Sequence, residues 1–288
     1  MSETQSGRKF VAACVQMTSA REFAPNIAAV GDLVRRARDA GAEFIATPEI
    51  TAMFEPKRDQ HLAKATGEAE NPALAAFREL AKETGAWLLI GSMAVKLEAT
   101  RLANRSFLIT PEGRIAARYD KIHMFDVDLK GGESYRESAL YQPGETPVLA
   151  ELPWGVLGMT ICYDLRFPYL YRTLAHAGAE FLSIPSAFTV PTGRAHWHVL
   201  HRARAIENAC FVIAPAQWGE HAEGRKTFGH SLIVDPWGEV LADAGEGVKV
   251  ITAEIDPAKI AEVRRMVPAL RHDRAIKAPA PPRALAAE

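Results

Sequence analysis

Cys162 stands at the end of an apolar run in the stretch GMTICYDLRFP, residues 158–168. A strand is predicted to end at Ile161 or Cys162 and a helix to begin near Pro168, because proline is tolerated in the first turn of a helix. Such a turn lifts a side chain to the end of a sheet, where pockets form, and directs backbone amides toward its target. The position suits a nucleophile. An inert core thiol fits equally well, because free cysteine is among the most buried residue types.

A cysteine nucleophile needs chemical help, because a thiol with an ordinary pKa of about 8.5 attacks at neutral pH only beside a base or a positive charge. Glu49 ends a strand directly after Pro48, and Lys121 lies in the mixed segment ARYDKIHMFD. Shielding by Phe54 or Met53 predicts a raised pKa for the Glu49 carboxyl, as a general base requires. A lysine beside it would stabilise an oxyanion. Taken singly, Glu49 also fits a helix-start acid and Lys121 a solvated loop charge.

The other cysteines give no sign of chemistry. Cys14 and Cys210 lie within the apolar runs FVAACVQM and NACFVIAPA, where inert core thiols are expected. Three cysteines without a CxxC pair indicate neither a disulfide framework nor a zinc knuckle. We therefore expect reduced thiols and a cytoplasmic location.

Three histidines lie close together in HWHVLH, at positions 196, 198 and 201. Residues two apart on a helix point about 200° from each other, so His196 and His198 cannot bind a metal from one face. We predict no metal site. His123 lies near Lys121, but no signature supports a papain-type Cys–His pair, so packing or hydrogen bonding is expected of it.

The elements that must position these residues alternate between strands and helices. Buried strands are predicted where apolar and small residues run together, and helices where apolar residues recur at helical spacing before a glycine. In the N-terminal half, the strands cover 9–17, 43–47 and 86–95, the helices include 27–37 and 72–84, and a strand pair surrounds the turn TPEG at 110–113.

Two segment pairs suggest that the chain consists of two related α/β halves. AGAEFIATPE (40–49) matches AGAEFLSIPS (177–186), and SFLITPEGRI (106–115) matches SLIVDPWGEV (231–240). Two such halves would pack sheet against sheet with helices on the outer faces. Local turn preference alone remains an alternative explanation. No linker separates the halves, so one domain is predicted over 1–276, followed by a Pro/Ala-rich tail over 277–288 that is extended, mobile or draped on a partner chain.

Composition limits the partners. The chain has 288 residues, of which 48% are hydrophobic, with 34 Lys and Arg against 35 Asp and Glu. A formal net charge of -1 provides no field that would draw the protein to nucleic acid or anionic lipid. The N-terminus lacks an apolar signal region, and no apolar stretch is long enough to span a bilayer. We predict a soluble protein that binds a small molecule, not nucleic acid or a membrane.

Four motifs carry a family resemblance. TPE (47–49), YDKIHMFD (119–126), ESALYQPG (137–144) and CYDLRFP (162–168) resemble, in order, the motifs of the nitrilase superfamily of carbon–nitrogen hydrolases. Further similarity extends from residue 9 to about residue 265 and is greatest to the Nit branch of amidases. The resemblance implies an α-β-β-α sandwich of two stacked mixed sheets with outer helices, and a homodimer or higher homo-oligomer.

The same resemblance implies a Glu49, Lys121 and Cys162 triad, with Glu137 as a supporting glutamate. Glu49 would take the Cys162 proton, the thiolate would attack an amide carbonyl, and Lys121 with the Tyr163 backbone amide would hold the oxyanion. Ammonia would leave, and water activated by Glu49 would hydrolyse the thioester. Glu137 would position Lys121 or the substrate amide. This chemistry requires neither a metal nor an organic cofactor.

Three further residues are candidates for substrate binding. Arg166 matches an arginine of Nit-type amidases, whose substrates resemble ω-amides of 2-oxo acids or deaminated glutathione, and its planar fork suits a carboxylate. An internal ion pair with Asp164 or Glu207 is the alternative. Phe188 and Thr189 follow a strand like the one before Glu49 and are expected to line the pocket, although Phe188 also fits the core.

The leading interpretation is a thiol amidase acting on a small carboxylate-bearing amide. Hydrolysis of an N-carbamoyl amino acid or of a nitrile uses the same triad, and the sequence separates these reactions poorly. A non-catalytic binding or scaffold protein is the alternative from another class. The intact triad positions argue against it.

Overall fold

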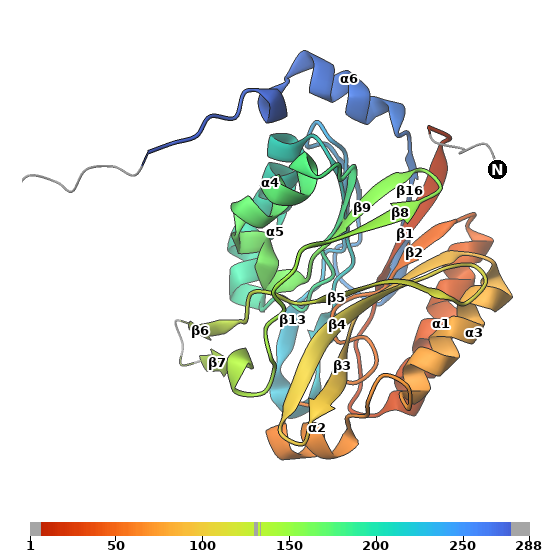
Figure 1. Cartoon of the computed structure of the whole chain (residues 1–288). Coiled ribbons are helices and arrows are strands. Elements are labelled where there is room, and N and C mark those ends of the chain that lie inside the picture. Colours follow the sequence, from red (N-terminus) through yellow and green to blue (C-terminus); the bar gives the residue numbers. More distant parts are fainter. Residues whose placement is uncertain (1–6, 130–131, 133, 278–288) are drawn as a thin grey trace, which may run out of the picture.

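Two six-stranded mixed sheets stack face to face in the computed structural model, which describes residues 7–129, 132 and 134–277 (Figure 1). The first sheet has the order β16 (Lys249–Ile255), β1 (Phe10–Gln16), β2 (Phe44–Ala46), β3 (Trp87–Glu98), β4 (Arg101–Ile109) and β5 (Ile115–Asp120). The second has the order β15 (Val240–Asp243), β14 (Leu232–Val234), β11 (Phe211–Ala214), β10 (Phe181–Ser183), β9 (Gly155–Met159) and β8 (Val148–Leu152).

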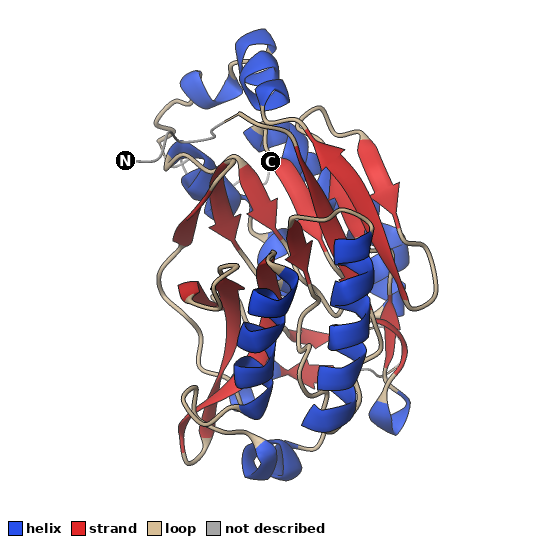
Figure 2. Ribbon diagram, turned by 90° about the vertical axis from the view of Figure 1, so that its right-hand side faces the viewer, coloured by secondary structure: helices blue, strands red, loops and turns tan. Residues whose placement is uncertain are grey.

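Helices cover the outer face of each sheet. Helices α1 (Phe23–Asp39) and α3 (Pro72–Thr84) lie on one side, and α4 (Pro168–His176) and α5 (Val190–Asn208) on the other (Figure 1). The view turned by 90° shows α1 and α3 side by side in front of the strands (Figure 2). The α-β-β-α sandwich expected from the sequence is therefore confirmed.

The remaining elements lie at the ends and edges of the sandwich. Two short hairpins pair β6 (Asp126–Asp128) with β7 (Ser134–Arg136) and β12 (Trp218–Glu220) with β13 (Lys226–Phe228). The other helices and 3-10 turns are α2 (Arg58–Lys64), α6 (Ala258–Met266), η1 (Glu137–Ala139), η2 (Cys162–Arg166), η3 (Ala222–Gly224) and η4 (Ala269–Arg271).

The two halves have the same strand order and the same pattern of directions. In the first sheet β1, β2 and β3 are parallel, and β4 and β5 return antiparallel. In the second sheet β9, β10 and β11 are parallel, and β14 and β15 return antiparallel. An antiparallel strand completes each sheet beside the first parallel strand, β16 against β1 and β8 against β9. The internal sequence matches therefore mark equivalent structural units.

Alternation along the strands distributes side chains between two cores. In β1, Ala12 and Cys14 pack in the core between the sheets, whereas Ala13 and Val15 pack in the core that includes residues of α1 and α3. Successive side chains of a strand point to opposite faces, so a strand covered on both sides must be apolar throughout. Burial on both faces explains the continuous apolar runs of the sequence.

The predicted helices form with small shifts at their ends. Helix α3 has the predicted bounds because the Asn71 side chain caps its first amides and Gly85, at φ 61°, ends it in the left-handed conformation. Helix α1 begins at Phe23, before Pro25, since proline is compatible with the first turn. No helix among the described residues is both long and apolar enough to cross a membrane. Apart from Lys277, the predicted tail lies outside the described residues.

Candidate active site

Cys162 opens the 3-10 turn between β9 and α4, at the predicted strand-to-helix connection, although β9 ends at Met159 and not at Ile161 or Cys162. Its backbone amide donates to the Pro185 carbonyl at 2.9 Å, which attaches the turn to the segment after β10. Cys162 has a φ of 48°, a left-handed conformation that costs free energy in a non-glycine residue and persists only where the surroundings impose it. The fold therefore holds the thiol at the end of the sheet in a strained turn.

Cys162 lines a cavity of about 320 Å³, a size typical of small-molecule sites. The other predicted site residues that line it are Glu49, Lys121, Glu137, Tyr163, Phe188 and Thr189. The Cys162 residue is 7% exposed, whereas Cys14 and Cys210 are 0% exposed and pack within the hydrophobic core. The structure thus separates one cavity thiol from two core thiols, as predicted.

Lys121 is the centre of a buried ionic cluster. Its Nζ lies 2.8 Å from Glu49 Oε1 and 3.0 and 2.8 Å from the two carboxylate oxygens of Glu137. The lysine is 2% exposed, so its charge depends on these two carboxylates. Glu49 Oε2 in turn accepts from the Ala187 amide at 2.9 Å, and Glu49 and Cys162 line the same cavity. The residues of the expected triad are therefore in one connected cluster, with Glu137 attached through Lys121.

Asn104, in β4, belongs to this cluster and was missed by sequence analysis. Its side-chain Nδ2 donates to Glu49 Oε1 at 3.0 Å and to Glu137 Oε1 at 3.1 Å. Its backbone carbonyl accepts from the Lys121 backbone amide at 3.0 Å. One amide side chain thus fixes the separation of the two glutamates. The only signal in the sequence was a polar residue within an apolar strand, which by itself does not indicate a site.

The charges of the cluster stabilise one another. Burial raises the pKa of the Glu49 carboxyl, but the charge and hydrogen bond of Lys121 outweigh it, so the pKa lies below its usual value. The predicted raised pKa was therefore wrong, because shielding by apolar neighbours is outweighed by an ammonium group in direct contact. Burial opposes the charge of Lys121, yet Glu137 and Glu49 raise its pKa well above the usual value.

The Cys162 thiol is protonated in the resting site. Burial, and then the negative charge of Glu49, raise its pKa well above the ordinary value despite the nearby Lys121. Proton transfer from Cys162 to Glu49 is therefore unfavourable before substrate binds. It becomes productive only if it accompanies carbon–sulfur bond formation, when the negative charge moves to the carbonyl oxygen.

Asp164 joins the Cys162 turn to the segment that carries Lys121. Its Oδ2 accepts from the Tyr119 hydroxyl at 2.7 Å and the Ile161 amide at 2.8 Å. Its Oδ1 lies 3.1 Å from the His123 amide and 2.7 Å from the His123 ring Nδ1. Residues 119 and 123 flank Lys121 on both sides, so one buried carboxylate sets its position relative to Cys162.

Asp164→Asn is expected to lower the free energy of unfolding by about 2–4 kcal/mol, because an amide nitrogen cannot accept hydrogen bonds and leaves buried donors unpaired. We expect kcat to fall at least about 10-fold as the Cys162 turn loosens. Urea unfolding and steady-state kinetics measure both effects. Tyr119→Phe, which removes a single bond, should cost about 1 kcal/mol. An Asn variant with wild-type stability and kcat would contradict this role.

Arg166 makes neither of the ion pairs considered as the alternative to substrate binding. Asp164 is bonded as described above, and Glu207 Oε1 accepts from Arg204 Nη1 at 2.8 Å. Arg166 instead lies over the Tyr163 and Phe188 rings, with its Cζ 5.9 and 5.5 Å from their centroids. Among the described residues, those that line the cavity include Tyr163 and Phe188 but not Arg166.

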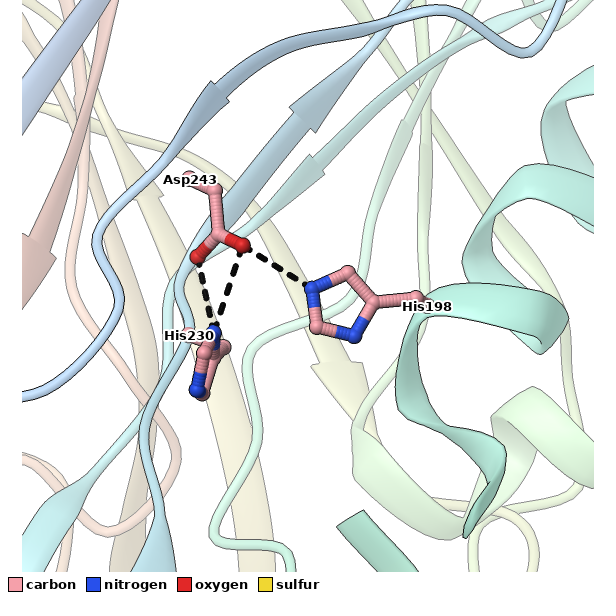
Figure 3. Close-up of side chains that lie close together, drawn as sticks. All are labelled: His198, His230 and Asp243. Carbon is pink, nitrogen blue, oxygen red and sulfur yellow. Dashed lines mark hydrogen bonds and ion pairs between the residues drawn. The ribbon is translucent and has the colours of Figure 1, made fainter. Parts of the chain in front are cut away.

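The three clustered histidines have different surroundings. His196 Nδ1 lies 3.2 Å from Arg166, and the buried His201 lies 2.7 Å from the Trp197 carbonyl. His198 lies 2.9 Å from Asp243, whose carboxylate oxygens are 3.0 and 3.2 Å from His230 Nδ1 (Figure 3).

Potential ligand atoms of His198, His230 and Asp243 all lie within 4.8 Å of one another. Sequence analysis missed this group because His198 meets residues from two other segments, the turn before β14 and strand β15 (Figure 3). Both histidines already hydrogen-bond to Asp243, and none of the three side chains lines the Cys162 cavity. The absence of a metal requirement stays a prediction.

The Glu49 carboxylate, the Lys121 ammonium group and the Cys162 thiol thus lie around one cavity, in the arrangement that the resemblance to the nitrilase superfamily implied. The sequence model described as carbon–nitrogen hydrolase matches residues 11–265. The chain therefore belongs to the carbon–nitrogen hydrolase family.

Individual relatives indicate which branch of the family the chain resembles. A Synechocystis protein named deaminated glutathione amidase is 43% identical over 270 residues, which cover 92% of this chain and 98% of that protein. A human protein of the same name is 39% identical over 273 residues, covering 92% and 82% of the two chains. The solved structure of Saccharomyces cerevisiae Nit3, described as a member of branch 10 of the nitrilase superfamily, has a TM-score of 0.83 at 28% identity and covers 93% and 97% of the two chains.

Proposed function

We propose that this chain is an amidase that cleaves a small carboxylate-bearing linear amide, of the deaminated glutathione or 2-oxo acid ω-amide type, through a thioester on Cys162. The observation that carries the proposal is the contact of Lys121 with both Glu49 and Glu137 in the cavity that Cys162 lines. The names of the relatives, deaminated glutathione amidase, support the substrate class.

In the first half-reaction the Cys162 sulfur attacks the amide carbonyl carbon as its proton passes to Glu49. The negative charge that develops on the carbonyl oxygen is stabilised by Lys121 and the Tyr163 backbone amide. The carbon–nitrogen bond then breaks, and the leaving nitrogen takes the proton from Glu49. A primary amide releases ammonia, whereas a peptide-like amide such as deaminated glutathione releases an amine.

In the second half-reaction water attacks the thioester as it gives a proton to Glu49. The carbon–sulfur bond breaks, the acid is released, and the Cys162 sulfur takes the proton back. Glu137 stays bonded to Lys121 throughout and keeps the ammonium group oriented while Glu49 changes its protonation. Glu49 thus acts as base and then acid in each half-reaction, while Glu137 is a positioning residue.

The other residues of the cavity wall would bind the substrate. Phe188 and Thr189 line it at the start of α5 and would contact the carbon chain of the substrate. We retain Arg166 as a candidate for a substrate carboxylate, since it lies against the Phe188 ring. No internal ion pair is recorded for Arg166 within the described part of the chain.

We also propose one catalytic domain over 1–276, a cytoplasmic location and a homodimer or higher homo-oligomer. Three free cysteines, all buried, fit a reducing compartment. The outer helices expose Tyr169, Val199 and Ile206, which are 62%, 67% and 52% exposed. Such apolar side chains on a helical face are typical of a subunit interface.

A substrate panel tests the proposed function. Deaminated glutathione, 2-oxoglutaramate, N-carbamoyl-β-alanine and a simple nitrile should be compared at equal concentration by following release of amine, ammonia or acid. We expect kcat/KM for one of the first two to exceed that for the others by at least about 10-fold, because an amide and a carboxylate must be recognised together. Preference for the carbamoyl compound or the nitrile would assign another reaction of the same triad. Inactivity toward all four would contradict the proposal.

A further inference from the structure

Arg225 lies at the tip of the β12–β13 hairpin and lines the same cavity as Cys162. Its guanidinium lies against two aromatic side chains of the cavity wall, with Cζ 4.9 Å from the Phe54 ring centroid and 5.0 Å from that of Tyr135. A guanidinium between two rings loses little conformational freedom when it binds a planar anion. Arg225 is therefore held in place in the cavity wall.

Among the residues that the structure describes, none provides an acceptor for the Arg225 guanidinium. The guanidinium makes no hydrogen bond or ion pair with the described residues, and its Nε is buried without a partner among them. A buried donor without an acceptor carries an unfavourable desolvation free energy, and such groups are rare in folded proteins. A ligand that brings two oxygen atoms would satisfy it.

The other cationic groups of the cavity are already occupied or more exposed. Lys121 is bonded to two glutamates, and Arg136 holds both Asp128 oxygens at 2.8 Å. Arg58 lies 3.7 Å from Asp59, and its side chain is 52% exposed. Burial lowers the pKa of His61 to about 4, so it is neutral at pH 7. Among the described cavity residues, Arg225 is thus the cation best placed to bind an anion.

The hairpin tip is anchored to the residues around the site. His221 stacks on Phe54 with ring centroids 4.0 Å apart, and its ring nitrogens lie 3.1 Å from the Ser19 carbonyl and 2.8 Å from the Thr227 hydroxyl. The His221 amide donates to the Arg225 carbonyl at 2.7 Å. Thr227 also forms a β-bridge with Thr189 of the cavity wall. Phe54 therefore contacts both an anchoring histidine and Arg225.

Two described acids near Arg225, Glu55 and Glu223, are paired with other cations. Glu55 accepts from Arg21 and Lys64, each at 2.9 Å. Glu223, two residues before Arg225, lies 3.2 Å from Arg21 and from Lys57. The positive charge of Arg225 is therefore left available to the cavity.

We propose that Arg225 binds the carboxylate of the amide substrate and so selects acidic over neutral amides. This proposal rests on the proposed amidase function and assigns its carboxylate recognition to the β12–β13 hairpin in place of Arg166. The guanidinium fork would donate hydrogen bonds to both carboxylate oxygens while the scissile amide reaches Cys162.

Glutaramate and its methyl ester form a matched substrate pair, since they share the amide and differ in the charge of the far end. We expect Arg225→Met to lower the ratio of kcat/KM for the acid to that for the ester by roughly 10- to 100-fold, the size of a lost charged hydrogen-bonded pair. Arg225→Lys should lower it less, because the charge remains without the fork. Arg166→Met tests the other candidate for the carboxylate and should lower the ratio less than Arg225→Met does.

Lys226→Met is the matched control, because it removes a neighbouring positive charge whose side chain is 63% exposed and paired with Glu220 at 3.3 Å. It should leave the ratio unchanged. Equal losses on acid and ester in Arg225→Met would show a structural role and overturn the proposal, as would a loss of the ratio in Arg166→Met alone.

Binding of glutarate separates this proposal from the amidase proposal, since it requires no turnover. Calorimetry on the Cys162→Ala protein should show glutarate binding, weakened at least about 10-fold by the added Arg225→Met change. Weakened binding without amide turnover in the wild type would support the carboxylate site and contradict the amidase function. If the wild type hydrolyses the amide but glutarate does not bind, or binds equally well after Arg225→Met, the amidase function is supported and the carboxylate site is contradicted.

Discussion

Cys162→Ala is expected to lower kcat on the best amide by at least about 10⁴-fold, because no other group can form the acyl intermediate. The free energy of unfolding should change only by the small amount expected for the loss of one sulfur atom. The thiol lines a cavity, and Asp164 still holds the turn. Steady-state kinetics on the purified variant, with circular dichroism to confirm folding, measure both effects. Turnover within about 10-fold of wild type would rule out Cys162 as the nucleophile.

Cys14→Ala is the matched control, since it removes the same sulfur from a thiol that is 0% exposed and packs between the sheets. It should lose some stability through a small cavity but keep its kcat. Iodoacetamide labelling gives a second readout, in which Cys162 reacts because the reagent can enter its cavity and Glu49 can take its proton, whereas the two core thiols stay unmodified until the protein unfolds. Equal labelling of all three cysteines in the folded protein would argue for a scaffold.

Lys121→Met should abolish measurable turnover and lower the free energy of unfolding by about 3–5 kcal/mol near neutral pH, because it leaves two buried carboxylates without their cation. In the wild type the Glu49 pKa is below its unfolded value, so its stabilising contribution is complete above that value and is lost as the pH falls. In the variant, burial and Glu137 should raise the Glu49 pKa above the unfolded value. Its destabilising effect then grows as the pH rises.

Urea unfolding of both proteins at about pH 5 and about pH 7.5 tests this sign, since carboxyl groups in water titrate near pH 4. The difference in stability should be smaller at the lower pH. Lys82→Met, which removes an exposed lysine paired with Glu79 within a helix, should show a small difference at both values. A Lys121→Met protein with pH-independent destabilisation would contradict the ionic account of the cluster.

Local patterns predicted the elements and several side-chain positions. The strands are buried on both faces, so they appear in the sequence as continuous apolar runs. The cap at Asn71 and the glycine at Gly85 determined the bounds of α3. Glu49 and Cys162 were found because each follows a strand, where a side chain reaches the end of a sheet. The matching segments predicted the second half from the first, since equivalent strands repeat the same pattern.

Such local patterns could not predict the contacts between distant strands. Lys121 and Glu49 are 72 positions apart, and the registers of β2 to β5 decide that they meet. Because local shielding was the only visible influence on Glu49, the direction of its pKa shift was wrong. Asn104 and Arg225 were missed for the same reason, as each acquires its role only from partners on other elements.

The equivalence of the two halves has a consequence for how activity arises. Glu49, Lys121 and Glu137 belong to the first half or the chain that leaves it, whereas Cys162 and Arg225 belong to the second. Either half alone would hold an acid–base pair without a nucleophile, or a thiol without a base. The reaction centre therefore forms only when the two halves pack together. The packing of the sheets that stabilises the fold also brings the catalytic groups into contact.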